Sequence, residues 1–297
     1  MSLASAVSRQ GSGPEVLLVG YTFRGRPAGV AFEAAASYGY DGIELRNFPE
    51  VNFSSVESVR KSLETVAPLA AETRIPVTAA FIAPILASDD NKETETRLGF
   101  YREILAVLAE QNVRILHTQV RRTRNVNGKT QTVVGSSAQD DDFDAAAAAL
   151  RAIGECAAEV GVVVAVESHM GTIHDLAFAQ HRLIARVDLP SVTASLDFCN
   201  IKMVHAEEDL DEVIDAFAGR IGYAHCKNLV REKSGAVHWN VSLAHGHLDY
   251  GSIVSKLESV GFKGPYGIEY CGPGDPHVYA REDAEYLRSV LERIRRK

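Results

Sequence analysis

The sequence has 297 residues, of which 46% are hydrophobic and 24% charged, and its formal net charge is −8. This composition is typical of a soluble globular protein, and no apolar run approaches the roughly 20 residues of a membrane helix, which excludes a membrane-spanning chain. The negative charge argues against a nucleic-acid partner, whose phosphates require a basic face. We therefore expect a cytoplasmic protein that acts on a small molecule.

Residues 1–15 are rich in Ser, Ala and Gly, which predicts a flexible N-terminal tail. After the tail, apolar runs typical of buried strands alternate with helical patterns. The predicted strands lie at 16–20, 41–45, 76–81, 113–120, 162–170, 192–198, 220–227 and 265–270. The predicted helices lie at 27–38, 55–73, 91–111, 142–160, 175–187, 206–218, 251–260 and from about 280 onward.

Eight strands that are each followed by a helix, with no shift in composition between them, predict a single (β/α)8 barrel domain over residues 16–297. A doubly wound open sheet has the same alternation, but the strand count and the chain length favour a closed barrel. The sequence has no G-x-G-x-x-G motif after the first strand, so it gives no support for a nucleotide cofactor. Two long connections, 121–141 and 228–250, are expected on the C-terminal face of the barrel, where such loops shape a substrate pocket.

The fifth predicted strand ends in Glu167, Ser168 and His169. Side chains two apart on a strand share a face, so Glu167 and His169 are expected to point the same way. A buried carboxylate requires a partner because an unpaired buried charge is costly. The next three strands end near residues that can provide one.

Predicted strands five to eight each end in a side chain that can bind a divalent cation, and the loops after barrel strands open on one face. These side chains are Glu167, Asp197, His225 and Glu269. Three carboxylates and one imidazole suit Mn²⁺ best in this interpretation, with Mg²⁺, Co²⁺, Fe²⁺ or Zn²⁺ as alternatives. The sequence therefore predicts one divalent metal site.

Several motifs resemble those of the xylose-isomerase-like TIM-barrel superfamily, which includes the sugar phosphate isomerases and epimerases. They are the four predicted ligands, His225-Cys226-Lys227, Gly246, Asp249-Tyr250, Gly267-Ile268-Glu269 and Asp41-Gly42-Ile43-Glu44. The resemblance implies that Glu167 and Glu269 bind the metal and also exchange a proton on a carbon next to a carbonyl. It further implies that Lys227 steadies an enediolate oxygen or contacts a carbohydrate substrate.

Two more residues are candidates for substrate binding. Glu44 ends the second predicted strand and can hydrogen-bond a sugar hydroxyl, although a structural ion pair is an equal alternative. His247 flanks Gly246 in the long loop after strand seven and is expected to line the pocket. The first functional hypothesis is therefore a metal-dependent isomerase or epimerase of a sugar or cyclitol.

A second hypothesis, a metal-dependent lyase, depends on His169. The segment 168–172, S-H-M-G-T, resembles the H-H-M-G-T of inosose dehydratases, and His169 is a candidate catalytic base. The metal-binding subunit of C-glycoside deglycosidases is similar in fold and works with a smaller partner chain. Asn200 and the lack of H-x-G-E-x-x-R after His225 argue against a ketohexose 3-epimerase. A homo-oligomer and a small partner subunit both remain open.

Overall fold

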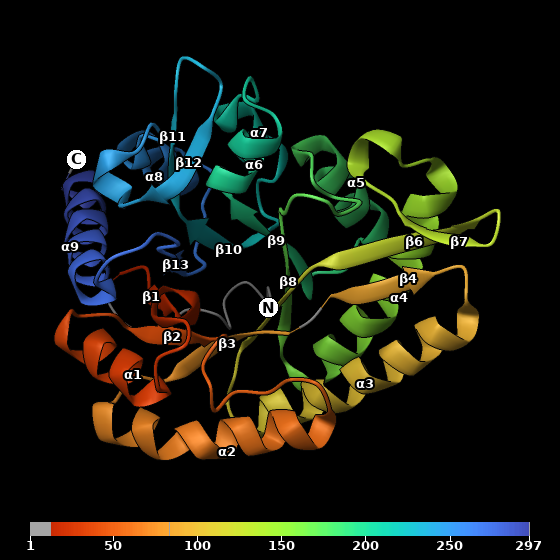
Figure 1. Ribbon diagram of the computed structural model, residues 1–297, viewed down its shortest axis with the longest axis horizontal. Coiled ribbons are helices and arrows are strands. Elements are labelled where there is room, and N and C mark those ends of the chain that lie inside the picture. The colour runs from red at the N-terminus through yellow and green to blue at the C-terminus, as the bar shows by residue number, and fades with distance from the viewer. Residues whose placement is uncertain (1–12, 83, 297) are drawn as a thin grey trace.

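Eight parallel strands close into a barrel, and the helices pack around its outside (Figure 1). The computed structural model describes residues 13–82 and 84–296. Each barrel strand pairs in parallel with the next, and the circle closes between β2 and β1. Around the barrel the strands are β1 (Val16–Val19), β13 (Tyr266–Ile268), β10 (Ile221–Cys226), β9 (Val192–Asp197), β8 (Val163–Glu167), β5 (Ile115–Thr118), β3 (Val77–Phe81) and β2 (Gly42–Leu45).

The helices bury their apolar faces against the outer side of the barrel. They are α1 (Ala28–Ser37), α2 (Val56–Thr73), α3 (Asn91–Glu110), α4 (Asp140–Val160), α5 (Ala177–Val187), α6 (Phe198–Val204), α7 (Leu210–Ala216), α8 (Tyr250–Ser259) and α9 (Pro276–Arg295). Among the residues described, none of them has the length and apolar character that crossing a bilayer requires. The predicted single (β/α)8 barrel is confirmed.

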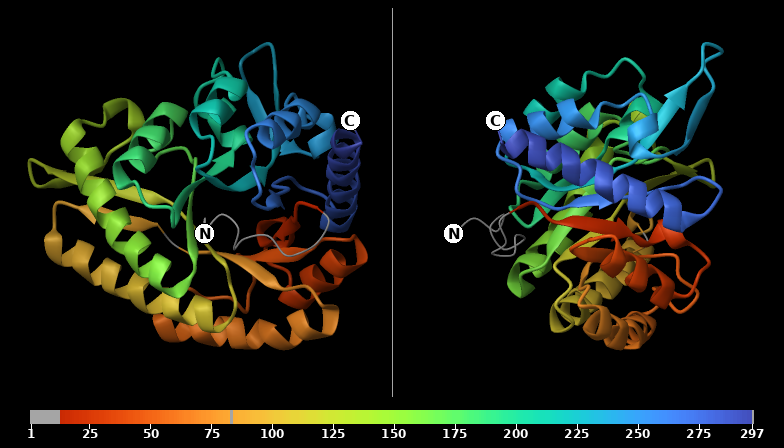
Figure 2. Two further views of the ribbon diagram at one scale, coloured as in Figure 1. Left: turned by 180° about the vertical axis from the view of Figure 1, so that it is seen from behind. Right: turned by 90° about the vertical axis from the view of Figure 1, so that its left-hand side faces the viewer.

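The two long connections on the C-terminal face contain strands of their own. In the first, β6 (Val120–Val126) and β7 (Lys129–Thr132) form a hairpin, and β6 also pairs with β4 (Ile85–Ser88). In the second, β11 (Asn228–Arg231) pairs with β12 (Val237–Val241), and this light-blue hairpin projects beyond the helices in Figure 2. The sequence did not predict these strands, because β7 is wholly exposed and polar and therefore lacks an apolar pattern.

Several predicted boundaries differ from the structure. The fourth predicted strand, 113–120, is interrupted after Thr118, and Val120 begins a strand of a different sheet. The predicted helix 206–218 corresponds to α7, and a second short helix, α6, precedes it directly after β9. Of the predicted tail, residues 1–12 lie outside the described residues. At its end, Glu15 is buried and accepts hydrogen bonds from Arg114 Nη2 at 2.6 and 2.9 Å.

The alternation of side chains along β8 connects the barrel interior to the C-terminal face. Val163 and Ala165 point inward and pack with Leu17, Ile115 and Tyr223 in a cluster that fills the barrel. Because side chains alternate along a strand, Glu167 continues this inward row at the end of β8. The strand therefore places a carboxylate directly above an apolar interior.

The β11–β12 connection is organised around one buried asparagine. The Asn228 side-chain amide donates to the carbonyl oxygens of Leu243 and Leu248, and its Oδ1 accepts from the N–H groups of Leu229 and Leu248. Gly246 passes so close that an added Cβ would lie 2.0 Å from the Asn228 side chain. Only glycine fits at this point, so this long segment has a defined backbone path beside the barrel mouth.

A buried histidine joins the β8–α5 connection to the start of β6. The Val120 N–H donates to His174 Nε2 at 2.9 Å, and His174 Nδ1 lies 3.2 Å from Thr172 Oγ1. Burial lowers the pKa of His174 to about 3. The folded protein therefore holds this ring neutral at a pH where an unfolded chain would protonate it.

We predict that His174 makes the fold sensitive to acid. Because its folded pKa lies below its unfolded pKa, its stabilisation is present above about pH 6.5 and is lost as pH falls toward 3. Between pH 8 and pH 5 the cost is about 2 kcal/mol. Urea unfolding at both pH values, compared between wild type and His174→Gln, measures it. The variant should lose less stability on acidification, and an identical pH dependence in both proteins would contradict this role.

Candidate metal centre

The four predicted metal ligands lie together at the C-terminal ends of neighbouring strands. Glu167 is the last residue of β8, Asp197 is the last residue of β9, His225 lies near the end of β10, and Glu269 directly follows β13. Their exposed fractions are 2%, 0%, 0% and 6%. The β-sheet register pairs His225 with Asp197 on one side and with Gly267 on the other, so the barrel itself sets their spacing.

One atom of each carboxylate faces the same ring nitrogen. His225 Nδ1 lies 3.5 Å from Asp197 Oδ2, 3.7 Å from Glu167 Oε1 and 3.9 Å from Glu269 Oε2. His225 Nδ1 is buried and makes no hydrogen bond among the described residues. A buried nitrogen without a hydrogen bond, surrounded by three carboxylate oxygens, is the arrangement expected around a cation.

The second oxygen of two of these carboxylates is held by a neighbouring group. Gln119 Nε2 donates to Glu167 Oε2 at 2.8 Å, and the Asn200 N–H donates to Asp197 Oδ1 at 2.9 Å. The latter contact makes Asp197 the N-cap of α6. Each side chain therefore turns only one oxygen toward His225, as a monodentate metal ligand would.

Two cations lie within the cluster. Lys227 Nζ is 2.9 Å from Asp197 Oδ2 and 3.2 Å from Glu269 Oε2. Arg46 Nη1 is 3.6 Å from Glu269 Oε1 and 3.4 Å from Glu44 Oε1, and its guanidinium lies 4.0 Å from the centre of the Phe81 ring. These contacts place positive charge on two sides of Glu269.

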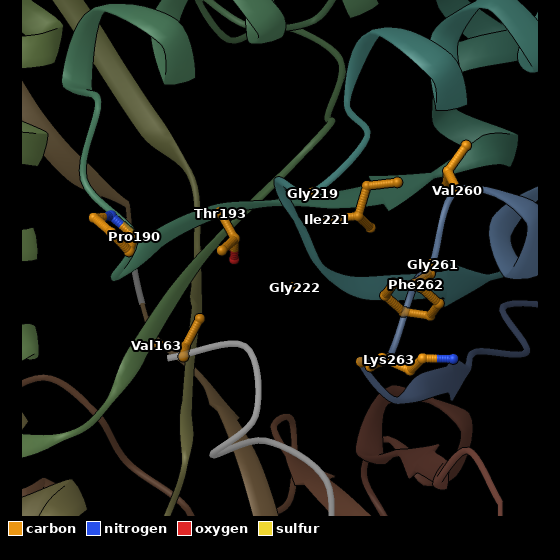
Figure 3. A pocket seen from close by; sticks show the side chains of 11 residues that line it. Val163, Pro190, Thr193, Gly219, Ile221, Gly222, Val260, Gly261, Phe262 and Lys263 are labelled. Carbon is orange, nitrogen blue, oxygen red and sulfur yellow. The ribbon is translucent and has the colours of Figure 1, made fainter. Parts of the chain in front are cut away.

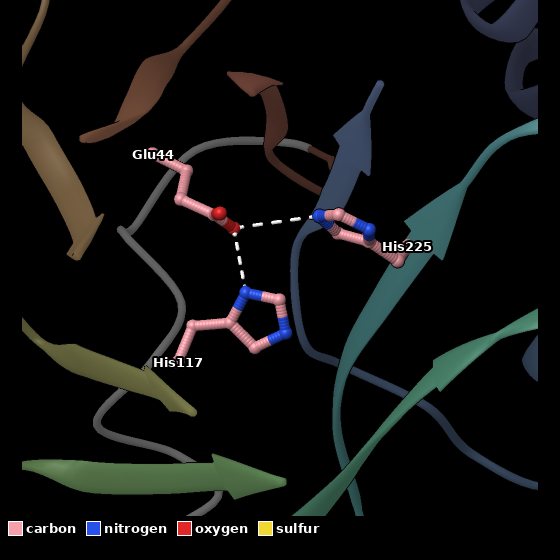
Figure 4. Close-up of side chains that lie close together, drawn as sticks. All are labelled: Glu44, His117 and His225. Carbon is pink, nitrogen blue, oxygen red and sulfur yellow. Dashed lines mark hydrogen bonds and ion pairs between the residues drawn. The ribbon is translucent and has the colours of Figure 1, made fainter. Parts of the chain in front are cut away.

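Glu44 faces the other ring nitrogen of His225, Nε2, and not the Nδ1 atom near the other three carboxylates (Figure 4). Its Oε2 is 3.4 Å from His225 Nε2 and 3.0 Å from His117 Nδ1, and all three side chains are fully buried. Burial alone would raise the pKa of Glu44, but His117 and His225 outweigh burial and hold that pKa well below its usual range. Glu44 is therefore an ionised carboxylate inside the barrel.

The electrostatics of the cluster favour a divalent cation. Burial lowers the pKa of His225, but contacts with Asp197, Glu44 and Glu269 outweigh it and raise this pKa to about 10. His225 is therefore protonated when no metal is bound, and a metal ion must displace this proton to use the ring as a ligand. With His225 neutral, Glu44, Glu167, Asp197 and Glu269 exceed Lys227 and Arg46 by two negative charges, which one divalent cation neutralises. Three carboxylate oxygens and one imidazole nitrogen fit Mn²⁺, Mg²⁺, Fe²⁺, Co²⁺ or Zn²⁺.

Two predicted site residues are not part of this cluster. His169 lies beyond the end of β8, is half-buried, and its Nδ1 is 2.9 Å from the carbonyl oxygen of Met170. His247 is exposed, and its Nδ1 accepts from the Arg231 N–H at 3.2 Å. Neither makes a hydrogen bond or ion pair with the cluster among the described residues. The shared face expected for Glu167 and His169 requires a strand that continues to residue 169, and β8 ends at Glu167.

Arg46, His117 and Gln119 were not predicted as site residues from the sequence. A signal for them exists, because residues two apart at the end of a strand share a face. Arg46 lies two residues after Glu44, and Gln119 lies two residues after His117. The same rule predicted a shared face for Glu167 and His169 that the structure does not have, so this spacing alone does not identify a site residue.

A pocket at the other end of the barrel has different chemistry (Figure 3). Its walls include Val163, Thr193 and Ile221 from the N-terminal parts of β8, β9 and β10, and Phe262 and Lys263 from the segment before β13. Among the described residues that line it, Lys263 is the only titratable one and none offers a metal-ligating group, so we take the C-terminal cluster as the candidate site.

Comparison with known proteins agrees with this geometry. The profile of a protein family described as xylose isomerase-like TIM barrel matches residues 32–290. Comparison with curated proteins gives no match.

Solved structures with similar folds share less than a fifth of their residues with this chain. A xylose isomerase-like TIM-barrel protein from Mycobacterium smegmatis in complex with magnesium has a TM-score of 0.72 at 18% identity, covering 95% of this chain and 98% of that one. The 3-keto-D-glucoside 4-epimerase of E. coli has a TM-score of 0.68 at 19% identity, covering 93% and 99%. An IolI protein with a bound zinc atom has a TM-score of 0.70 at 16% identity, covering 94% and 97%.

We predict that Lys227 stabilises the metal-free cluster. Replacing it in Lys227→Met removes the ammonium between two buried carboxylates, which should lower the free energy of unfolding by about 3 kcal/mol in EDTA. Excess Mg²⁺ should restore part of this loss. Urea unfolding with and without Mg²⁺ is the measurement.

The control is Lys256→Met, which breaks the ion pair of Lys256 with the exposed carboxylate of Asp215. Solvent screens that surface pair, so its loss should cost much less than the loss of Lys227. Equal losses in the two variants would show that the buried cluster does not depend on Lys227.

Proposed function

Because the chain belongs to the xylose isomerase-like TIM-barrel family, we propose that it is a divalent-metal-dependent isomerase or epimerase of a sugar or cyclitol. The observation that carries this proposal is the convergence of Glu167, Asp197 and Glu269 on His225 Nδ1. Mn²⁺ is the metal that we propose for this donor set, with the other divalent cations named above as alternatives.

The proposed metal ligands are Glu167, Asp197, His225 and Glu269. A divalent cation bound there would polarise carbonyl and hydroxyl oxygens of a substrate and so acidify the hydrogen on the adjacent carbon. The chain's own residues would then move that proton. We assign this step to two carboxylates of the cluster.

Glu167 and Glu269 are the proposed proton-transfer residues. They belong to the strand ends of β8 and β13, which are separated by β9 and β10, and therefore approach the cluster from different sides. If one carboxylate removes the proton and the other returns a proton on the opposite face, the carbon is inverted. If the proton moves between adjacent carbons instead, an aldose and a ketose interconvert.

Other side chains would orient these two. Gln119 holds one oxygen of Glu167, and Lys227 contacts Glu269 Oε2. The Lys227 ammonium is also a suitable donor to an enediolate oxygen. Burial alone would lower the pKa of Lys227, but the negative charges of Asp197 and Glu269 outweigh burial and keep this pKa well above its usual range. Epimerases among the structurally similar proteins support this reaction class.

A lyase is the second candidate. His169 Nδ1 contacts the carbonyl oxygen of Met170, which can only accept, so the hydrogen lies on Nδ1 and a lone pair remains on Nε2. A general base requires that form of imidazole. A 3-DHS dehydratase from Bacillus anthracis is among the similar structures. In this alternative His169 would remove the proton and the substrate would lose water.

We predict that a substrate takes up deuterium at the carbon next to its carbonyl when it is incubated with the Mn²⁺-loaded chain in D₂O. The substrates to test are ketohexoses, ketopentoses and inososes, and NMR measures the exchange. Glu167→Gln and Glu269→Gln should each lower the exchange rate by about 100-fold or more, because an amide cannot accept the proton. Glu159→Gln, at an exposed position of α4, is the control and should exchange normally.

The same experiment separates the two reactions. Exchange without loss of water, and without an effect of His169→Asn, supports the isomerase or epimerase. Dehydrated products that disappear in His169→Asn support the lyase. Normal exchange in both glutamate variants would contradict the proposed roles of these carboxylates.

A further inference from the structure

Three fully buried side chains from different parts of the barrel meet behind the proposed metal site. Glu44 comes from β2, His117 from β5 and His225 from β10, and these strands are not neighbours in the sheet. Glu44 Oε2 is 3.0 Å from His117 Nδ1 and 3.4 Å from His225 Nε2 (Figure 4). Glu44 was predicted from the sequence as a candidate substrate-binding residue. In the structure it is fully buried beside His225 Nε2, where it can hold the histidine ring.

Both ring nitrogens of His225 lack a hydrogen bond among the described residues, and the Glu44 carboxylate lies 3.4 Å from Nε2. Nδ1 faces three carboxylate oxygens, which would hold a hydrogen on that nitrogen and so block it as a ligand. Glu44 is the carboxylate beside Nε2, and an ionised carboxylate can only accept. A hydrogen on Nε2 directed at Glu44 leaves the lone pair of Nδ1 facing Glu167, Asp197 and Glu269.

The Glu44 carboxylate is itself held at both oxygens. His117 Nδ1 contacts Oε2, and Arg46 Nη1 lies 3.4 Å from Oε1. The His117 ring is fixed by edge contacts with Tyr223 and Phe81, at centroid distances of 5.1 and 5.4 Å. The carboxylate therefore has little freedom to turn away from His225.

We propose that Glu44 and His117 are a positioning pair for the metal ligand His225. Glu44 accepts the Nε2 hydrogen of His225, so that Nδ1 is presented to the divalent cation, and His117 fixes the Glu44 carboxylate in that orientation. Carboxylates that contact the remote nitrogen of a ligating histidine commonly act in this way. The inference rests on the proposed metal-dependent function, and it assigns no substrate contact to either residue.

The same three side chains could instead hold a second metal ion, since their ligand atoms lie within 4.8 Å of one another. The 3.0 Å contact between His117 Nδ1 and Glu44 Oε2 favours the positioning pair, because this is a normal hydrogen-bond length. The number of ions bound per chain distinguishes the two arrangements.

The test measures Mn²⁺ affinity and stoichiometry by titration calorimetry on the full chain. Glu44→Gln should weaken binding about 10- to 100-fold. His117→Leu should also weaken it, although it leaves every carboxylate in place, whereas His117→Asn, which keeps a donor near the Nδ1 position, should bind nearly as wild type does. Glu232→Gln, in the exposed pair of Glu232 and His238, is the matched control.

A second readout reports the tautomer directly. In the Zn²⁺-loaded, ¹⁵N-histidine-labelled chain, NMR should find the His225 hydrogen on Nε2, and this assignment does not depend on whether Glu44→Gln folds. A hydrogen on Nδ1, two ions per chain, or unchanged affinity in both Glu44→Gln and His117→Leu would overturn the positioning pair while leaving the proposed function intact. A wild-type chain that binds no divalent cation would overturn both.

Discussion

The site depends on how the barrel accommodates several buried carboxylates close to one another. Four carboxylates converge at the C-terminal end, and repulsion between buried anions is strong because the surrounding dielectric is low. The chain offsets it with Lys227 and Arg46 and with polar contacts that hold individual oxygens, and the charge that remains matches a divalent cation. The eight strands supply the rigidity, since each acidic side chain is fixed by a strand end rather than by a flexible loop. The barrel fold therefore determines the distances between the charged groups of the site.

Much of the barrel and the core of the site follow from local patterns in the sequence. Buried strands such as β8 are visible as short apolar runs, and the acidic or imidazole groups at the ends of four of them mark the side that carries chemistry. Where the sequence interpretation differs from the structure, the chain leaves regular geometry. His169 lies past the last residue of β8, so the two-residue alternation no longer sets its direction. The β6–β7 and β11–β12 hairpins lie outside the barrel sheet, and only the pairing of β6 with β4 joins segments that are far apart in the sequence.

Several residues that were not assigned to the site from the sequence share one property: each contacts a carboxylate of the cluster and is not itself a predicted ligand. Gln119, Asn200 and His117 hold one atom of Glu167, Asp197 and Glu44 respectively, and in doing so they determine which atom remains free. A polar residue near a strand end has many possible partners, and only the closed barrel decides among them. The supports of a site are thus harder to predict from a sequence than the groups that they support.

Tyr223 illustrates how the barrel limits change at this site. Its ring contacts those of His117 and His225, and it fits because Gly267 on β13 has no side chain, since a Cβ there would lie 2.1 Å from the Tyr223 hydroxyl. A single methyl group on β13 would therefore push the tyrosine toward the histidines. The floor of the site is therefore coupled to the packing of the barrel interior, so a substitution on β13 would disturb the two histidines without touching either of them.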